Sequence, residues 1–497
     1  MRQGKGRVIL NLRTPWLAGI AALALVTSVA APAQADPSKK RLRTAIDRIV
    51  ERPAWAHAFW GIEVRSLESG KTLYERNADR AFRPASTLKL VTTAAVLDAF
   101  GPEERLRTTV ETAGRLDGLG RILGDVFFVG RGDPSLSGRF DEGAPTAAFE
   151  AMAEALVDAG VRRIEGRLVG HEGALAGDRR GADWMVEDLA WGYGAEVSAL
   201  TFNDNVVHVI LKPGERPGDP AVLEAVPRTS FAHIASAVVT GAAGTKEDVV
   251  VGRPLGSNRV LLSGVLPRGG EWEGEVAVED PALFAVTVFG EVLQAKGVAV
   301  MGGVATSSDP LPSAARVLAA HDGVPMARLI AEVNKESQNL HAELLLRVLG
   351  LRLLGEGTME RGHEAVEEFL VRLEVPHAGW SVEDGSGLSH TNVVTPRGLA
   401  ALLVAMDRHP QAAAFRASLA VAGVDGTLED RMRGTPAETR VTAKTGGLKS
   451  VNALAGYVTT ERGERLAFAF LVNNHVELSD AAKAALDDMA VVLATAR

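Results

Sequence analysis

The chain has 497 residues, of which 46% are hydrophobic and 23% charged, and its 54 Lys and Arg against 62 Asp and Glu give a net charge of −8. This composition is typical of folded globular protein and excludes intrinsic disorder, while the acidic balance argues against a nucleic-acid-binding protein, which usually presents a basic face. The absence of Cys excludes disulfide scaffolds, thiolate metal sites and thiol nucleophiles.

Residues 1–35 have the pattern of a secretory signal peptide. Basic residues without acids, from Arg2 to Arg13, precede the apolar run Trp16–Ala31, and Ala33-Gln34-Ala35 supplies the small residues that signal peptidase selects. The apolar run is shorter than the ~20 residues that a spanning helix needs. We therefore expect cleavage after Ala35, export to the periplasm or another extracytoplasmic part of the cell envelope, and no membrane span in the mature protein. A retained anchor is the alternative.

Residues 36–106 predict the first part of an α+β domain. A charged helix in Asp36–Arg52 precedes two strand-like runs, Trp60–Leu67 and Lys71–Arg76, which a short turn joins into a hairpin. The next segment, Ser86–Phe100, predicts a buried helix because it is apolar nearly all round and has clear start and stop signals.

Residues 107–320 differ in composition from the segments on either side, and their pattern predicts one or two mostly β domains inserted into the chain. They are rich in Gly and Val and contain short alternating runs such as Val206–Lys212 and Val260–Leu266. We expect one helix among them, Thr146–Gly160.

Residues 321–497 predict the second part of the α+β domain. Helical patterns cover Ala327–Val333, Asn339–Leu354, Glu364–Glu374 and Pro396–Asp407. Three antiparallel strands and a final helix follow at Arg440–Lys444, Ala453–Thr460, Arg465–Val472 and Leu478–Ala494. Since the opening hairpin and the closing strands can share one sheet with helices on both sides, we expect one domain built from both ends of the chain.

Most common catalytic layouts are missing from the sequence. There is no H-E-x-x-H zinc pair, no G-x-S-x-G nucleophile elbow, no Walker loop and no dinucleotide fingerprint, and nothing points to a Ser-His-Asp triad. We therefore expect neither a metal nor a cofactor. Three short motifs remain as candidates for chemistry.

The first motif is Ser86-Thr-Leu-Lys89, at the start of the buried helix. Residues i and i+3 lie on one side of a helix a turn apart, so the Lys89 amine can reach the Ser86 hydroxyl. A lysine acts as base toward a serine nucleophile when burial and nearby cations lower its pKa. Such a tetrapeptide also occurs by chance, usually on the surface, but here Lys89 lies between Leu88 and Leu90, an unfavourable place for an unused charge.

The second motif is Ser337-Gln-Asn339, at the start of a helical segment. Ser337 offers a hydroxyl that can relay a proton, and Asn339 offers an amide that can bond both the lysine and a substrate. A helix N-cap is the alternative, because Ser and Asn are favoured there. Ser450-Val-Asn452 has the same pattern, but it lies beside the third motif and cannot form a separate wall.

The third motif is Lys444-Thr-Gly446, on a predicted strand that runs into Gly447. A pair of glycines lets a substrate lie close against the strand, while Lys444 and Thr445 present a cation and a hydroxyl to a carboxylate. An edge strand protected by a lysine is the alternative.

In this order the three motifs resemble the penicillin-recognising serine acyltransferases, whose Ser-x-x-Lys, Ser-x-Asn and Lys-Thr-Gly elements line one cleft. The unusually long separation of Ser86 and Ser337 is similar to that of the low-molecular-mass class C penicillin-binding proteins, the D-alanyl-D-alanine carboxypeptidase/endopeptidases. Further segments that resemble this group are Gly130–Pro134, Asp384–Ser389, Ala422–Leu428 and Ala443–Tyr457.

The resemblance implies a serine β-lactamase/transpeptidase-like fold, an antiparallel sheet flanked by helices, that acts on peptidoglycan stem peptides ending in D-Ala-D-Ala. It also implies that β-lactams acylate the same serine and act as inhibitors. The implied roles are Ser86 as nucleophile, Lys89 as its base, Ser337 as proton relay, Asn339 as the amide that bonds the peptide, Lys444 and Thr445 as carboxylate-binding residues, and the backbone N–H groups of Ser86 and Gly447 as oxyanion hole.

Two positions depart from the family's pattern. Gly447 stands where a second Thr usually follows Lys-Thr-Gly, so one hydroxyl expected near the substrate carboxylate is missing. His390 stands where Arg usually follows Gly-Leu-Ser. Neither change removes a catalytic group, so we expect both to affect substrate preference and rate rather than the chemistry.

Two alternative functions remain open at this point. A β-lactamase or esterase on the same fold would release a penicillin adduct fast, whereas a carboxypeptidase would retain it. A catalytically inactive peptidoglycan-binding scaffold would not be labelled by penicillin, and the intact motifs argue against it.

Overall fold

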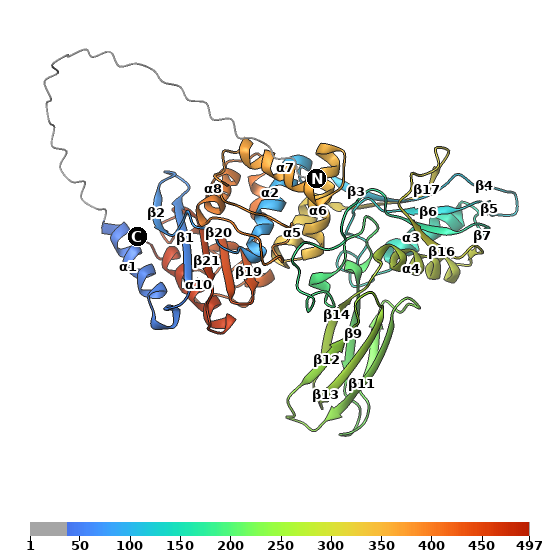
Figure 1. Ribbon diagram of the computed structural model, residues 1–497, viewed down its shortest axis with the longest axis horizontal. Coiled ribbons are helices and arrows are strands. Elements are labelled where there is room, and N and C mark those ends of the chain that lie inside the picture. Colours follow the sequence, from blue (N-terminus) through green and yellow to red (C-terminus); the bar gives the residue numbers. More distant parts are fainter. Residues whose placement is uncertain (1–36, 497) are drawn as a thin grey trace, which may run out of the picture.

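The computed structural model describes residues 37–496, so the predicted signal peptide lies outside the described residues (Figure 1). A layered body of helices and strands occupies one side of the molecule, and a group of smaller sheets extends from it (Figure 1). None of the helices in the described part is both long and apolar enough to cross a membrane.

Both ends of the described chain contribute to one six-stranded sheet. Its order is β18-β19-β20-β21-β1-β2, and all neighbouring strands are antiparallel. The opening hairpin therefore lies beside a strand from the end of the chain, with Trp60 opposite Val472. The strands are β1 (Phe59–Ser66), β2 (Thr72–Arg76), β18 (Ala420–Val421), β19 (Val441–Leu448), β20 (Val451–Thr459) and β21 (Arg465–Asn473).

Helices cover both faces of this sheet (Figure 1). In β21, Phe468 and Phe470 point into one core and Ala467 and Ala469 into the other, as the alternation of a pleated strand requires. Burying each Phe contributes roughly 1.5–3 kcal/mol. One face carries α1 (Pro37–Val50) and α10 (Ser479–Ala494), and the other side holds α2 (Lys89–Phe100), α5 (Met326–Lys335), α6 (Asn339–Leu354), α7 (Met359–Arg372), α8 (Pro396–Asp407) and α9 (Ala412–Ala417).

Helix α2 follows a single 3-10 turn over Ala85–Leu88 and lies among the other helices of its layer. All nine residues from Lys89 to Leu97 are buried, which explains why the segment is apolar all round rather than along one stripe. The helix ends at Gly101, whose φ of 71° favours glycine.

Residues 105–325, between α2 and α5, form separate sheets. One group contains a five-stranded sheet, β16-β8-β6-β3-β17, and a four-stranded sheet, β15-β7-β5-β4, packed with α3 and α4 around a common core. Its elements are β3 (Arg105–Thr112), β4 (Arg115–Leu116), β5 (Arg121–Leu123), β6 (Val126–Val129), α3 (Ala147–Asp158), β7 (Arg163–Ile164), β8 (Leu168–His171), α4 (Pro281–Ala295), β15 (Ala299–Val300), β16 (Val304–Ser307) and β17 (Arg316–Pro325).

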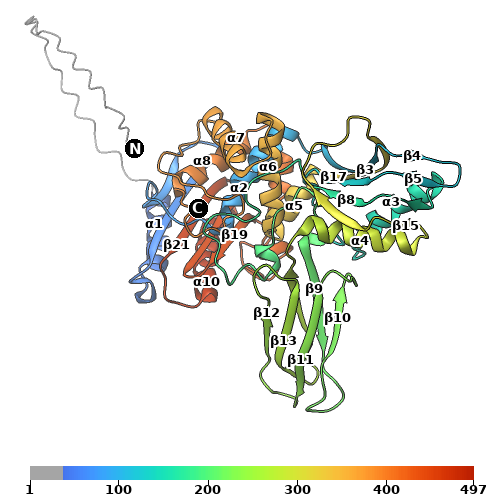
Figure 2. The same cartoon turned by 45° about the vertical axis from the view of Figure 1, so that its right-hand side comes forward.

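A second group within these residues forms two three-stranded sheets, β10-β9-β14 and β11-β13-β12. These strands project away from the rest of the molecule in both views (Figure 1 and Figure 2). They are β9 (Val206–Lys212), β10 (Val222–Val226), β11 (His233–Gly241), β12 (Asp248–Gly252), β13 (Arg259–Pro267) and β14 (Trp272–Ala277). We refer to residues 105–325 as the inserted domains.

The expectation of a single helix in this part of the chain is wrong, because α4 is a second one. Its sequence is apolar nearly all round and contains several β-branched residues, so it lacks the stripe by which a helix is recognised. Asp280, which caps the helix, and Pro281 in its first turn are start signals, but hydrophobic periodicity alone does not include them. The short helix α9 was not predicted either, and α7 begins earlier than expected, because Thr358 caps it.

Candidate active site

Ser86 lies in the 3-10 turn that precedes α2, against a turn formed by residues 384–389. Ala85 has a φ of 48°, and Gly387 has a φ of 84°. A Cβ at position 387 would lie 2.0 Å from the Ala85 carbonyl oxygen, so only glycine fits there. This close backbone contact fixes the point at which the Ser86 hydroxyl emerges.

Lys89 is fully buried, and its amine contacts three oxygen atoms. Lys89 Nζ lies 2.9 Å from Ser86 Oγ, 2.5 Å from Asn339 Oδ1 and 2.7 Å from the carbonyl oxygen of Ser386. Burial lowers the pKa of Lys89 to about 7, although two nearby carboxylates act in the opposite direction. An amine with this pKa is partly neutral near pH 7 and can accept a proton.

Those two carboxylates, Glu343 and Asp384, are themselves buried and hold the turn that presents the Ser386 carbonyl. Glu343 Oε1 accepts hydrogen bonds from the backbone N–H groups of Gly385 and Ser386, both at 2.8 Å. Asp384 Oδ1 accepts one from the Gly387 N–H at 2.7 Å. Because that N–H and the Ser386 carbonyl belong to one peptide unit, Asp384 polarises the oxygen that the lysine amine contacts.

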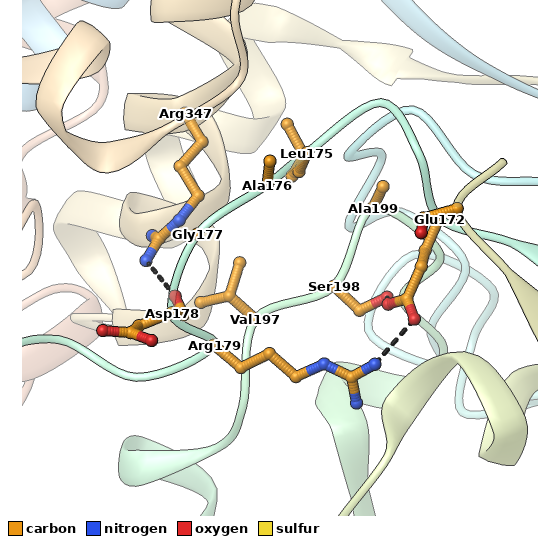
Figure 3. A pocket seen from close by; sticks show the side chains of 11 residues that line it. Glu172, Leu175, Ala176, Gly177, Asp178, Arg179, Val197, Ser198, Ala199 and Arg347 are labelled. Carbon is orange, nitrogen blue, oxygen red and sulfur yellow. Dashed lines mark hydrogen bonds and ion pairs between the residues drawn. The ribbon is translucent and has the colours of Figure 1, made fainter. Parts of the chain in front are cut away.

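Glu343 is paired with Arg347, one turn later on α6. Arg347 Nη1 lies 3.1 Å from Glu343 Oε2, and Arg347 Nη2 donates to the carbonyl oxygen of Asp178 at 3.1 Å. Figure 3 shows Arg347 reaching this carbonyl at the wall of a cavity of about 290 Å³. Burial and the charge of Asp384 raise the pKa of Glu343, and Arg347 opposes this shift. The inserted domains are thereby bonded to the residues beneath the site.

Ser337 and Asn339 lie in the turn at the start of α6. Ser337 has a φ of 62°, and its Oγ accepts a hydrogen bond from Lys444 Nζ at 2.9 Å. Asn339 Nδ2 donates to the carbonyl oxygen of Tyr193 in the inserted domains at 2.8 Å. The N-cap of α6 is Gln338, whose side chain accepts from a backbone N–H of the first turn. Capping therefore engages neither the Ser337 hydroxyl nor the Asn339 amide.

Lys444 on β19 is a second fully buried amine. Besides Ser337 Oγ, Lys444 Nζ contacts the carbonyl oxygen of Thr445 at 3.0 Å. Burial, and after it the charge of Lys89, lowers the pKa of Lys444 well below its usual value. The Thr445 hydroxyl lies 2.9 Å from that of Thr427.

The end of β19 beyond Lys444 has an open edge. The neighbouring strand β18 pairs only with Thr442 and Ala443. A Cβ at Gly447 would meet nothing closer than Asn452 Nδ2 at 3.8 Å, an ordinary contact. Asn452 binds Ser479 and His475 instead of the site, so the second Ser-x-Asn pattern supplies no wall.

These groups surround a cavity of about 490 Å³, which we call the catalytic cavity. Four predicted site residues line it, namely Ser86, Ser337, Asn339 and Gly447. Buried Lys89 and Lys444 lie behind them, in contact with the two serine hydroxyls. The remaining lining residues are Met185, Asp188, Tyr193, Gly387, Leu388, His390, Leu448 and Lys449.

The inserted domains supply a further wall through Met185, Asp188 and Tyr193, which was not predicted. The Tyr193 hydroxyl donates to Asp188 at 3.2 Å. Burial raises the pKa of Asp188 and, with the Asp188 charge, raises the pKa of Tyr193 to about 12. These residues lie in a long irregular segment without a motif, so the sequence carries no signal for them. Asp384, in contrast, opens a segment that the resemblance had singled out.

Within residues 37–496, no group of three or more His, Asp or Glu side chains is arranged to hold a metal ion. The catalytic cavity instead combines a hydroxyl, buried amines and an amide. This set can activate a serine nucleophile and protonate a departing group.

Comparison with known proteins decides the family. The model of the D-Ala-D-Ala carboxypeptidase 3 (S13) family matches residues 42–496. The chain belongs to this family. It is 37% identical over 462 residues to the D-alanyl-D-alanine carboxypeptidase of an Actinomadura species, covering 90% of this chain and 84% of that protein.

The fold of this family member is similar to that of penicillin-binding protein 4 from Haemophilus influenzae, with a TM-score of 0.78 at 23% identity, covering 90% of this chain and 97% of the other. The same Haemophilus protein complexed with a β-lactam gives a TM-score of 0.71 at 22% identity, with the same coverage. The resemblance to the D-alanyl-D-alanine carboxypeptidase/endopeptidase group and the α+β fold class are therefore confirmed. The chain is a serine-type peptidase of the carboxypeptidase family.

Proposed function

We propose that this protein hydrolyses peptidoglycan stem peptides ending in D-Ala-D-Ala through an acyl-serine intermediate. One observation carries the proposal. Residues from three segments that lie far apart in the sequence meet around one cavity. Lys89 Nζ contacts Ser86 Oγ at 2.9 Å and Asn339 Oδ1 at 2.5 Å, and Lys444 Nζ contacts Ser337 Oγ at 2.9 Å.

In the acylation step, Lys89 acts as base toward Ser86. Its amine lies 2.9 Å from Ser86 Oγ, and its pKa of about 7 leaves it partly neutral. Ser86 Oγ attacks the carbonyl carbon of the penultimate D-Ala while its proton passes to Lys89. The backbone N–H groups of Ser86 and Gly447 bind the oxyanion, and donors of this kind contribute ~3–4 kcal/mol each.

Ser337 then passes a proton to the departing amine, and the carbon–nitrogen bond breaks. The terminal carboxylate binds to Lys444 and Thr445, while Asn339 bonds a backbone amide of the peptide. Burial lowers the pKa of Lys444, and a carboxylate bound next to the amine acts in the opposite direction. Binding of the carboxylate and protonation of Lys444 therefore favour each other. Water finally cleaves the acyl-enzyme, with Lys89 again as base.

β-Lactams acylate Ser86 by the same route and then stall, so they act as inhibitors. The support is the similarity of this fold to that of penicillin-binding protein 4 from Haemophilus influenzae, which has been obtained complexed with a β-lactam.

The place of action and the extent of the domains are part of the same proposal. The basic and apolar pattern of residues 1–35 supports removal of a signal peptide and action in the cell envelope, in the periplasm where an outer membrane exists. Residues 36–104 and 326–497 then form the transpeptidase-like domain, and the inserted domains, residues 105–325, interrupt it. The boundaries expected from the sequence, with 36–106 and 321–497 flanking 107–320, differ from these by only a few residues.

The substitution Ser86→Ala tests the proposal. In the mature protein, residues 36–497, we expect it to reduce D-alanine release from a pentapeptide and cleavage of cross-linked dimers by more than about a thousandfold, because the nucleophile is lost. Mass spectrometry of digested peptidoglycan separates pentapeptide trimming from dimer cleavage. Turnover retained by Ser86→Ala would overturn the assignment, and fast release of hydrolysed penicillin by the unaltered protein would favour a β-lactamase.

A further inference from the structure

A second cavity, which we call the side cavity, adjoins the catalytic cavity. Its volume is also about 490 Å³, and the two cavities share Tyr193, Ser337 and Asn339 as lining residues. The turn at the start of α6 forms one wall, and the inserted domains form the other. Among the other lining residues are the ionisable side chains Arg139, His208, Glu273, Glu275 and Glu336.

The position of Ser337 relates this space to one half of the substrate. The amine that departs from Ser86 has to lie within reach of the Ser337 hydroxyl, which protonates it. Ser337 stands on the boundary of the two cavities, and the acyl half stays beside Ser86, in the catalytic cavity. The departing half of the substrate therefore extends from Ser337 into the side cavity. Free D-alanine is much smaller than this space, since binding cavities of roughly 300–1,000 Å³ enclose drug-sized ligands.

The charges that line the side cavity indicate which chemical groups the departing half of the substrate would carry. Arg139 is engaged by Asp204 and, at 3.0 Å, by Glu275. His208 Nε2 lies 3.3 Å from Glu273. Glu336 makes no ion pair with any residue in the described range 37–496, and this leaves an excess of negative charge on the walls. Amides and ammonium groups are favoured there over carboxylates.

We propose that the side cavity binds the departing half of a cross-linked peptide substrate beyond the residue whose carboxylate Lys444 and Thr445 hold. In that outer part it prefers amide or ammonium groups to free carboxylates. This inference rests on the proposed function, which it deepens. The bond that breaks is the amide between the acyl D-Ala and the amine of the second peptide; Ser86 Oγ takes the acyl carbon, and the amine leaves with the proton from Ser337. Water later supplies the hydroxyl that frees the first peptide.

The test uses the mature protein and two synthetic cross-linked peptide dimers. Both keep the carboxylate next to the scissile amide, and they differ only in the rest of the departing half, which carries either carboxylates or carboxamides. A pentapeptide substrate measures the hydrolysis of D-Ala-D-Ala itself. The kcat/KM for each dimer is divided by the kcat/KM for this pentapeptide. We expect a higher kcat/KM for the carboxamide dimer. The substitution Glu273→Lys should shift the ratio of the two dimers by at least about fivefold toward the carboxylate form, because it reverses a charge on the wall.

The matched control is Glu271→Lys, just before β14. Glu271 is paired with Lys212 at 3.4 Å and does not line the side cavity, so this variant should leave the ratio of the dimers as it is. Both positions are exposed, with side-chain exposures of 52% for Glu273 and 48% for Glu271, so folding should be maintained. Labelling by fluorescent penicillin checks this in each variant.

An equal preference for the two dimers, a ratio unchanged by Glu273→Lys, or a ratio changed equally by Glu271→Lys would each overturn the inference. So would a protein that trims the pentapeptide and does not cleave either dimer. In all these results penicillin labelling and pentapeptide hydrolysis persist, and the proposed function stands. If the unaltered protein is not labelled by penicillin and does not hydrolyse the pentapeptide, the proposed function fails and the inference fails with it.

Discussion

At the scale of single residues, the proposed chemistry depends on two buried amines. Lys89 and Lys444 are fully buried, and neither forms an ion pair within the part of the chain that the structure describes. Their N–H groups are satisfied by hydroxyl, amide and carbonyl oxygens instead of carboxylates. Burial disfavours the charged form of each amine, and no carboxylate in contact with it offsets this, so the pKa of each is lowered.

The first prediction concerns pH. Because burial lowers the pKa of Lys89 from the usual 10.5 to about 7, its neutral form is present above pH 7 and is lost as the pH falls. The rate of acylation by penicillin should therefore rise about tenfold for each pH unit below 7 and level off above it. The rate constant is measured with a fluorescent penicillin between about pH 5 and pH 9.

The control for this prediction is Lys89→Arg, which keeps a positive charge at every accessible pH and should be inactive throughout. A flat profile for the unaltered protein across the range would contradict the assignment of Lys89 as base.

A second prediction concerns Gly447, where the chain lacks a hydroxyl that its family usually has. The nearest atom to an added Cβ is 3.8 Å away, so Gly447→Thr should be accommodated without a clash. A hydrogen bond to a charged acceptor contributes roughly 1.5–3 kcal/mol, so kcat/KM for substrates with a terminal carboxylate should rise about tenfold or more.

The isosteric variant Gly447→Val is the matched control, because it fills the same space without a hydroxyl. Equal kinetics for Gly447→Thr and Gly447→Val would show that position 447 does not contact the carboxylate.

At the scale of elements, a turn and a helix start position the nucleophile. The turn of residues 384–389 is held by Glu343 from α6 and by its own Asp384, and its Gly387 packs on the backbone before Ser86. The residues that make these contacts, Glu343, Asp384 and Gly387, all lie far from Ser86 in the sequence. The orientation of the nucleophile is therefore set by two segments that lie far from it in the chain.

The substitution Gly387→Ala tests this arrangement. Its Cβ would lie 2.0 Å from the Ala85 carbonyl oxygen at a φ of 84°, so the turn has to move away and carry the Ser386 carbonyl off the Lys89 amine. We expect penicillin acylation to slow by about a hundredfold or more, since misplacement by about 1 Å is enough for such a loss.

Gly379→Ala is the matched control for this variant. Gly379 has the same φ of 84°, but an added Cβ there meets no atom within 4 Å. It should lose only the roughly 1–2 kcal/mol that a left-handed conformation costs and should label normally. Comparable acylation rates in the two alanine variants would contradict the role of the Gly387 contact.

The elements also show what a sequence can predict. Helices α6 and α8 have the predicted bounds, Asn339–Leu354 and Pro396–Asp407, because their apolar pattern and their ends are local features. Helix α4 was missed, since burial on all sides removed its periodicity. Tyr193 and the pairing of Glu343 with the turn could not be predicted, because they depend on contacts between distant segments.

At the scale of the whole molecule, the site is assembled by the meeting of both chain ends with the inserted domains. Three hydrogen bonds join the inserted domains to α6: from Asn339 to the Tyr193 carbonyl, from Arg347 to the Asp178 carbonyl, and between His341 and Asp204 at 2.8 Å. Asn339 also contacts Lys89, so one side chain connects the inserted domains to the proposed base. The motifs predicted that Ser86, Lys89, Ser337, Asn339 and Lys444 would meet, and the structure brings them together; the roles of these residues remain predictions.

The most direct test of this account is to treat the mature protein with penicillin and to locate the covalent adduct by peptide mass spectrometry. The account predicts an adduct on the peptide that contains Ser86, stable long enough to isolate, and no adduct in Ser86→Ala. An adduct on any other residue, or no adduct in a folded protein that still releases D-alanine from a pentapeptide, would contradict it.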